Sequence, residues 1–207
     1  MRITDIGMTK HGNVAVSVDG EYLFTATPDA WVRADLSPGD EITGEQIETL
    51  SHDTACDRAR KKALSMLSAR AYTKKQLTDR LARTHGGEAA DSAVESMCDW
   101  GLIDDADYAE RYARELLETR GYAPRRIRYE LQKRGISRAD IDAALEKLED
   151  TDETGEAVRL LERKYHMLAT DADVRRAAAL LGRCGYSGDV IRTAIHAVRR
   201  LGNEDSI

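Results

Sequence analysis

The sequence predicts a mainly α fold of three tandem three-helix repeats in an elongated array, preceded by a small N-terminal β-hairpin cap. Three observations support this fold class. First, 33% of the residues are charged and only 5% are aromatic, a balance typical of helices. Second, the chain of 207 residues has only three prolines and resembles itself at an offset of 50 residues. Third, a strand pattern occurs only near the N-terminus. Hydrophobic residues make up 42%, enough to form a core.

The cap is predicted over residues 1–52. Residues 14–18 alternate valine with smaller or polar residues, a period of two that indicates a strand. Asp19-Gly20 follows at once and favours a type I′ turn, so residues 21–25 should return as a second strand. Residues 2–8 are expected to supply a third strand.

A capping box at Thr43 and Gln46 predicts a short helix that ends at about Ser51. Helical periodicity then begins at about Ala55. When the chain is shifted by 50 residues, Arg70 and Tyr72 fall on Arg120 and Tyr122, with two basic residues following in both copies. This self-match and a second shift of 50 predict three repeats over 55–102, 103–149 and 152–200.

Each repeat is predicted to contain three helices, most clearly the second. Asp104 or Asp105 caps its first helix, and Gly121 ends that helix. Pro124 suits the first turn of the next helix, and Ser137 caps the third. One such unit buries only one face of each helix, so we expect the repeats to stack.

We expect neither a targeting or membrane segment nor a disulfide or metal site at the cysteines. The N-terminus lacks an apolar core of signal-peptide length, and no run approaches the ~20 apolar residues that span a membrane. We therefore expect a soluble, cytoplasmic protein, a monomer that makes no membrane contact. Cys56, Cys98 and Cys184 are odd in number and form no CxxC pair, so they should be free thiols rather than disulfides or metal ligands.

No enzyme motif is present, so we predict a non-enzymatic protein with no catalytic residues, cofactor or metal. The sequence has no glycine-rich phosphate loop and no HExxH, and Gly86-Gly87 reads as a linker between helices. Asp104-Asp105 precedes a helix and is better explained by capping than by a carboxylate pair. Five histidines lack a partner at metal-ligand or triad spacing in the sequence: His11, His52, His85, His166 and His196.

Positive charge is concentrated in two segments, although the net charge is −6. Residues 55–85 hold 9 basic and 2 acidic residues, a net +7, and residues 119–138 hold 7 and 1, a net +6. A solvated helix face would also explain such runs. We favour a surface for an anionic ligand because the charge recurs at repeat-related places. Its candidate residues are Arg58, Arg60, Lys61, Lys62, Arg70, Lys74, Lys75, Arg80, Arg83, Arg120, Arg125, Arg126, Arg128, Lys133 and Arg134.

Tyr72 and Tyr122 lie beside these basic residues. They have the chemistry to stack or hydrogen-bond at the rim of such a surface. Packing between helices is the interpretation we favour for both.

The central part of the chain resembles the RecX regulatory family. The resemblance rests on Trp100-Gly101-Leu102-Ile103-Asp104-Asp105, Tyr108-Ala109, Arg120-Gly121 and Ile127-x-x-Glu130-Leu131-x-x-x-Gly135-Ile136. Residues 63–70 with Thr73, Leu77 and Leu81 resemble the first repeat of that family, and the likeness extends over about 55–198. The family commonly has an acidic residue where this chain has Gln76.

The resemblance implies binding to the RecA recombinase and its filament on single-stranded DNA. It further implies restraint of filament growth, ATP hydrolysis and strand exchange, in recombination, DNA repair and the SOS response. It supplies no catalytic residues. The alternative is a helical adaptor that binds only protein, which salt dependence would distinguish because phosphate contacts weaken steeply with salt.

The first two repeats, rather than the third, are expected to carry the contact. In the third repeat Arg175 and Arg176 recur at the same offset, but Asp171 and Asp173 flank them. Loss of charge at Arg125, Arg126 and Arg128 should therefore weaken filament binding more than the same loss at Arg192, Arg199 and Arg200.

Overall fold

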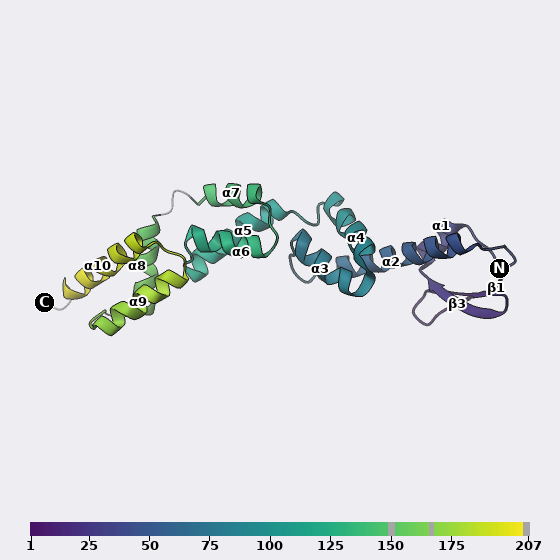
Figure 1. Ribbon diagram of the computed structural model, residues 1–207, viewed down its shortest axis with the longest axis horizontal. Coiled ribbons are helices and arrows are strands. Elements are labelled where there is room, and N and C mark those ends of the chain that lie inside the picture. Colours follow the sequence, from purple (N-terminus) through teal and green to yellow (C-terminus); the bar gives the residue numbers. More distant parts are fainter. Residues whose placement is uncertain (149–151, 166–167, 205–207) are drawn as a thin grey trace. The chain divides into compact units, whose positions relative to one another are not determined.

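The computed structural model describes residues 1–148, 152–165 and 168–204. The chain divides into two compact units, Met1–Asp104 and Asp105–Ile207. Ten helices follow three short strands within the described ranges, so the predicted mainly α fold with a small N-terminal sheet is confirmed (Figure 1). Across those ranges, no helix combines the length and the apolar character that a membrane crossing requires.

The N-terminal sheet is antiparallel, in the order β1-β2-β3. Its strands are β1 (Ile3–Met8), β2 (Val14–Val18) and β3 (Glu21–Ala26). The three valines of β2 are buried, as their alternation predicts. Asp19 and Gly20 have φ angles of 52° and 89°, the positive values that a type I′ turn requires. Strand order and turn therefore follow the sequence pattern.

A short helix, α1 (Pro28–Ala34), packs against this sheet. It was not predicted from the sequence. Thr27 caps it by accepting a hydrogen bond from the backbone N–H of Ala30, and Pro28 stands in the first turn. Trp31 is buried in the core between α1 and the sheet. This aromatic anchor gives the small cap the apolar interior that a lone three-stranded sheet lacks.

The next helix, α2 (Gly44–Leu67), corrects the predicted boundary. Thr43 and Gln46 do form the expected capping box. The helix does not end at Ser51, however, and continues through Ala55 into the first repeat. No proline or glycine lies between residues 45 and 67, so nothing in the sequence breaks it. The cap and the first repeat therefore share one helix.

Two further helices complete the first unit: α3 (Lys74–His85) and α4 (Gly87–Asp99). Thr73 and Gln76 form a capping box at the start of α3, so Gln76 makes the local contact that a carboxylate makes at such a position. Gly86, with a φ of 86°, joins α3 to α4, as the predicted linker. Both helices pack with α2 around one apolar core.

The second unit begins with α5 (Asp105–Arg120), α6 (Pro124–Lys133) and α7 (Arg138–Glu146). Three of the local signals predicted here are confirmed. Gly121, with a φ of 61°, follows the end of α5, Pro124 opens α6, and the Ser137 side chain caps α7. These three helices enclose a separate core.

Three more helices follow: α8 (Glu153–Lys164), α9 (Asp171–Arg183) and α10 (Gly188–Glu204). They share a second core of this unit, centred on fully buried leucines such as Leu161 and Leu181. His166 lies outside the described residues.

The turn between α5 and α6 lies against the turn between α9 and α10. The buried Ala123 N–H donates to the Cys184 carbonyl at 2.9 Å. Gly185 has a φ of 94°, and a Cβ added there would lie 2.7 Å from the Arg126 Cβ. Tyr122 packs against the cores on both sides. The two groups of three helices in this unit are thus joined by direct backbone contact.

Candidate anion-binding surfaces

The basic residues predicted on α2 differ in how far they are engaged. Arg58 donates to the Thr25 carbonyl at 3.3 Å, and Arg60 pairs with Asp57 at 2.5 Å. Lys61 and Lys62 are exposed. Arg58 therefore helps to hold α2 against the cap, whereas Arg60 pairs within α2. The two lysines are the side chains of this group best placed to meet a ligand.

Asp57 links α1, α2 and the end of β3. Its carboxylate accepts from the Thr27 hydroxyl at 2.6 Å and from Arg33 at 3.0 and 3.2 Å, in addition to Arg60. Burial raises the pKa of Asp57, but the hydrogen bonds from Thr27, Arg60 and Arg33 outweigh burial and leave this pKa below its usual range. Asp57 is therefore a structural anion that neutralises nearby arginines.

A hollow of about 660 Å³ lies beside these residues in the first unit. Arg58, Arg60 and Lys61 line it, together with Leu64 and Trp100. Trp100 is 56% exposed, unusual for so large an apolar ring. Asp29 and Asp57 also line the hollow, so its charge is mixed.

On α3, Lys74, Lys75 and Arg83 are exposed, and Lys75 pairs with Asp79 at 3.1 Å. Two other predicted cations are turned toward Tyr72 instead. The Arg70 guanidinium lies 4.0 Å from the centre of the Tyr72 ring, and Arg80 donates to the Tyr72 hydroxyl at 3.4 Å. Tyr72 is itself buried, so packing is its role, as favoured from the sequence.

The basic helix of the second repeat, α6, is only partly free. Arg126 pairs with Glu130 at 2.7 Å, and Arg128 pairs with Asp142. Arg134 donates to the Tyr112 hydroxyl at 2.6 Å and stacks on that ring. The exposed cations of α6 are Arg125 and Lys133. The predicted anionic-ligand surface of each repeat therefore includes cations that already have partners within the fold.

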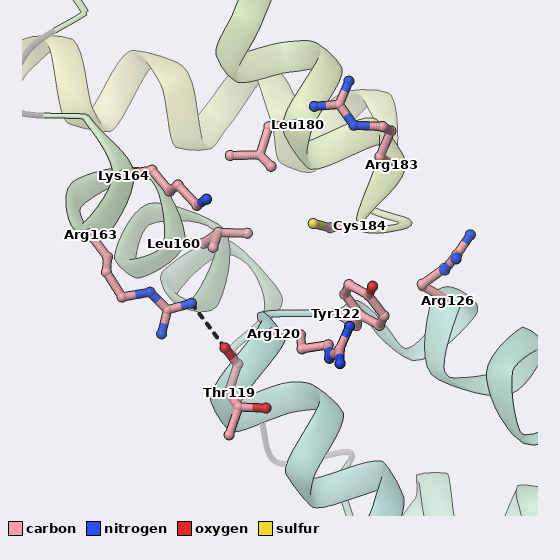
Figure 2. Close-up of a pocket in the computed structure, with 10 residues that line it drawn as sticks. All are labelled: Thr119, Arg120, Tyr122, Arg126, Leu160, Arg163, Lys164, Leu180, Arg183 and Cys184. Carbon is pink, nitrogen blue, oxygen red and sulfur yellow. Dashed lines mark hydrogen bonds between the residues drawn. The ribbon is translucent and has the colours of Figure 1, made fainter.

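A second hollow, of about 490 Å³, lies within the second unit between the α5–α6 turn, α8 and α9 (Figure 2). We call it the basic pocket. Its cations come from two repeats, and Leu160, Leu180, Tyr122 and Cys184 supply its apolar surface. The cations are Arg120, Arg126, Arg163, Lys164 and Arg183.

Of the five cations of the basic pocket, only Arg120 and Arg126 were predicted from the sequence as binding residues. Lys164 and Arg183 are the last residues of α8 and α9, where cations interact favourably with the helix dipole. Their positions in the sequence therefore did not indicate a binding site. They reach the pocket only because the third repeat folds onto the α5–α6 turn. The third repeat also contains the Arg176–Asp173 pair, at 3.1 Å, in keeping with the expected effect of the flanking acids.

One histidine has neighbours that the sequence did not indicate. The His52 ring lies 3.5 Å from the Cys56 sulfur and 3.7 Å from a carboxylate oxygen of Glu88. Cys56 is 5% exposed and belongs to the core of the first unit, which leaves little room for a substrate at its sulfur. Within the described residues, no group of three or more histidine, cysteine or acidic side chains is arranged to hold a metal ion.

The fold and these surfaces define a class of small helical-repeat proteins with basic faces and a short β cap. The family model for the second three-helix domain of RecX matches residues 104–145. Regulatory protein RecX of Caldanaerobacter subterraneus subsp. tengcongensis is 31% identical over 189 residues, covering 90% of this chain and 94% of that protein. The chain belongs to the RecX family of regulatory proteins.

Further relatives and solved structures agree with this assignment. Regulatory protein RecX of Bacillus subtilis is 27% identical over 195 residues, which are 92% of this chain and 74% of that protein. A crystal structure of regulatory protein RecX superposes with a TM-score of 0.70 at 25% identity, over 95% of this chain and 98% of that one. RecX from Lactobacillus salivarius has a TM-score of 0.56 at 26% identity, covering 70% and 96%.

Proposed function

We propose that this protein binds the RecA recombinase and its filament on single-stranded DNA, and restrains ATP hydrolysis and strand exchange without catalysing a reaction itself. The observation that carries the proposal is the exposed charge on the second helix of two repeats. Arg83 on α3, with Arg125 and Lys133 on α6, are exposed in a protein of the RecX family. Their exposed charge matches a polyanionic partner.

Restraint follows from occupancy. A filament on DNA is an extended polyanion, and exposed arginines and lysines release counterions when they meet its phosphates. A protein held along the filament blocks the subunit movements that ATP hydrolysis and strand exchange need. No acid, base or nucleophile is required, in keeping with the burial of Cys56.

A filament ATPase assay tests this function. RecA, a poly-dT strand and ATP are mixed with rising amounts of the protein, and the hydrolysis rate is followed at 50 and 200 mM salt. We expect the rate to fall with added protein, and inhibition to weaken strongly at the higher salt. An unchanged hydrolysis rate at equimolar protein and RecA would contradict the proposal.

The alternative is a helical adaptor that binds only protein. It is favoured by the ion pairs on α6, where Arg126 and Arg128 already hold acidic partners. An adaptor would inhibit RecA with little salt dependence and would not shift the fluorescence anisotropy of a labelled strand. The same two salt concentrations therefore separate the two functions.

A further inference from the structure

In the basic pocket of the second unit, Arg126 is the one cation that holds an ion pair among the described residues, with Glu130 at 2.7 Å. Among the described residues that line it, none is acidic. Lys164 and Arg183 form no ion pair with any described residue, and Arg163 reaches only the Thr119 carbonyl, at 3.5 Å. Elsewhere in the same unit arginines commonly hold an acid, as Arg159 holds Glu156 at 2.6 Å. Like charges gathered around one hollow repel one another when it is empty, and a bound anion lowers this repulsion.

The cations of the basic pocket face it to different degrees, and Arg163 turns toward the Thr119 carbonyl. In Figure 2 the Lys164 amine, the Cys184 sulfur and Leu180 point toward the middle of the hollow, with Arg126 and Arg183 at its edge. Burial raises the pKa of the Cys184 thiol, and the charges of Arg183, Arg126 and Lys164 oppose that rise. Side chains from α6, α8 and α9 therefore share one electrostatic field.

The walls of the basic pocket are fixed before any ligand arrives. Gly185 allows the α9–α10 turn to contact the Arg126 backbone, since a Cβ there would lie 2.9 Å from the Arg126 nitrogen. The hydrogen bond from Ala123 to Cys184 holds the same two turns together. A site formed in advance binds without the entropic cost of ordering its walls.

The lining fits a nucleotide. A hollow of about 490 Å³ lies within the usual range for small-molecule sites. Guanidinium groups and an amine suit phosphate oxygens, and the Tyr122 ring with Leu160 and Leu180 offers apolar surface to a base or sugar. An acidic peptide would satisfy the charge but would leave that apolar surface unused.

We propose that the basic pocket binds the phosphates of a nucleotide and seats the base or sugar against Tyr122 and Leu180. The nucleotide is either a free nucleoside polyphosphate or one unit of a single-stranded nucleic acid. This site goes beyond the proposed function because it lies partly in the third repeat and requires no recombinase. It assigns a binding role to Lys164 and Arg183.

Binding to the isolated full-length protein tests the site, with no recombinase present. Isothermal titration calorimetry is carried out with sodium triphosphate, with ADP and with an oligo-dT strand, and hexaglutamate serves as the non-phosphate anion. The test variant is Lys164→Gln/Arg183→Gln. The control, Arg192→Gln/Arg199→Gln, removes two exposed charges from α10 outside the pocket. Circular dichroism and thermal melting must match the parent protein in both variants.

We expect phosphate ligands to bind the parent and the control, and to lose about tenfold or more in affinity for the test variant, because two charge-assisted hydrogen bonds are removed. Preference for ADP over oligo-dT identifies a free nucleotide as the source, and the reverse preference identifies a strand. The site is overturned if no phosphate ligand binds, if the control loses as much affinity as the test variant, or if hexaglutamate binds as tightly as triphosphate. None of these results depends on RecA, so they leave the proposed function to its own assay.

Discussion

Gly185 lies so close to Arg126 that a single added carbon would bring the two Cβ atoms to 2.7 Å. The left-handed backbone of Gly185, with a φ of 94°, adds strain for any other residue. We predict that Gly185→Ala lowers the free energy of unfolding by about 1–3 kcal/mol, as measured by thermal or urea denaturation.

Gly182 provides the matched control for that substitution. It lies in α9, and a Cβ added there meets nothing within 4 Å. Gly182→Ala should stabilise the protein by up to about 1 kcal/mol, because alanine is the better helix former. Equal effects of the two substitutions would show that the contact with Arg126 contributes nothing.

The exposed cations of α6 allow a sharper test of filament binding than the triple change at Arg125, Arg126 and Arg128. Arg126 packs on Gly185 and Arg128 pairs with Asp142, so their loss would also disturb the fold. Arg125→Gln/Lys133→Gln should weaken inhibition of the RecA ATPase and reduce the slope of log affinity against log salt by about 1.4, roughly 0.7 for each phosphate contact.

The control for the α6 change is Arg192→Gln/Arg199→Gln, which removes the same charge from α10. The expectation that the third repeat contributes less to the contact remains a prediction. If this control loses more inhibition than the α6 variant while both proteins remain folded, the filament contact lies in the third repeat instead.

Asp57 should make the stability of the protein depend on pH in the acid range. Because its pKa is lowered in the folded state, its contribution is fully present above the unfolded-state pKa of about 3.9 and is lost as pH falls through the folded-state value. Asp57→Asn should cost about 1–3 kcal/mol at pH 7 and should flatten the stability curve below about pH 4.

Asp53 serves as the comparison for Asp57. It meets Arg33 at 3.5 Å, and its side chain is 35% exposed against 10% for Asp57. Asp53→Asn should change stability by less than about 1 kcal/mol, as exposed pairs do. Urea denaturation of both variants between pH 2 and 7 measures the difference, and parallel curves would contradict the role given to Asp57.

Intrinsic fluorescence reports on the hollow of the first unit. The two tryptophans differ sharply, since Trp100 is 56% and Trp31 only 8% exposed. Trp100→Phe should therefore remove most of the emission that acrylamide quenches and leave the protected signal of Trp31. Unchanged quenching in this variant would show that the ring of Trp100 is covered in solution.

His52 and Cys56 lie in contact, and we expect that neither takes part in the inhibition of RecA. His52→Ala should leave inhibition of the RecA ATPase unchanged. Cys56→Ala should lower stability by about 1 kcal/mol, because it removes a buried sulfur from the core, and should also leave inhibition intact. Loss of inhibition in either folded variant would point to a reactive site in the first unit.

Local signals in the sequence predicted local structure well. Gly121, Pro124 and Ser137 end, open and cap helices as their side chains and backbone preferences require. Helix α1 was not predicted because it is short and has little hydrophobic periodicity, although Thr27-Pro28 is a typical start of a helix. The predicted end of α2 is wrong because the residue pattern changes near residue 52 while the helix continues to Leu67.

The candidate surfaces were only partly predictable, because pairing depends on contacts distant in sequence. Charge runs identified α3 and α6, but no run reveals that Arg128 meets Asp142 from α7. The basic pocket combines Arg120 with Lys164 and Arg183, which lie more than 40 residues away in the chain. Only the docking of one turn on another brings them together.

The hydrogen bond between Ala123 and Cys184 has a consequence for folding. A chain cut after α7 would leave the buried Ala123 N–H without its acceptor and would uncover one side of Tyr122. The last two repeats should therefore melt in a single cooperative step, and limited proteolysis should release them as one fragment. The sequence repeat is therefore not the unit of folding in this part of the chain, because the second and third repeats fold together.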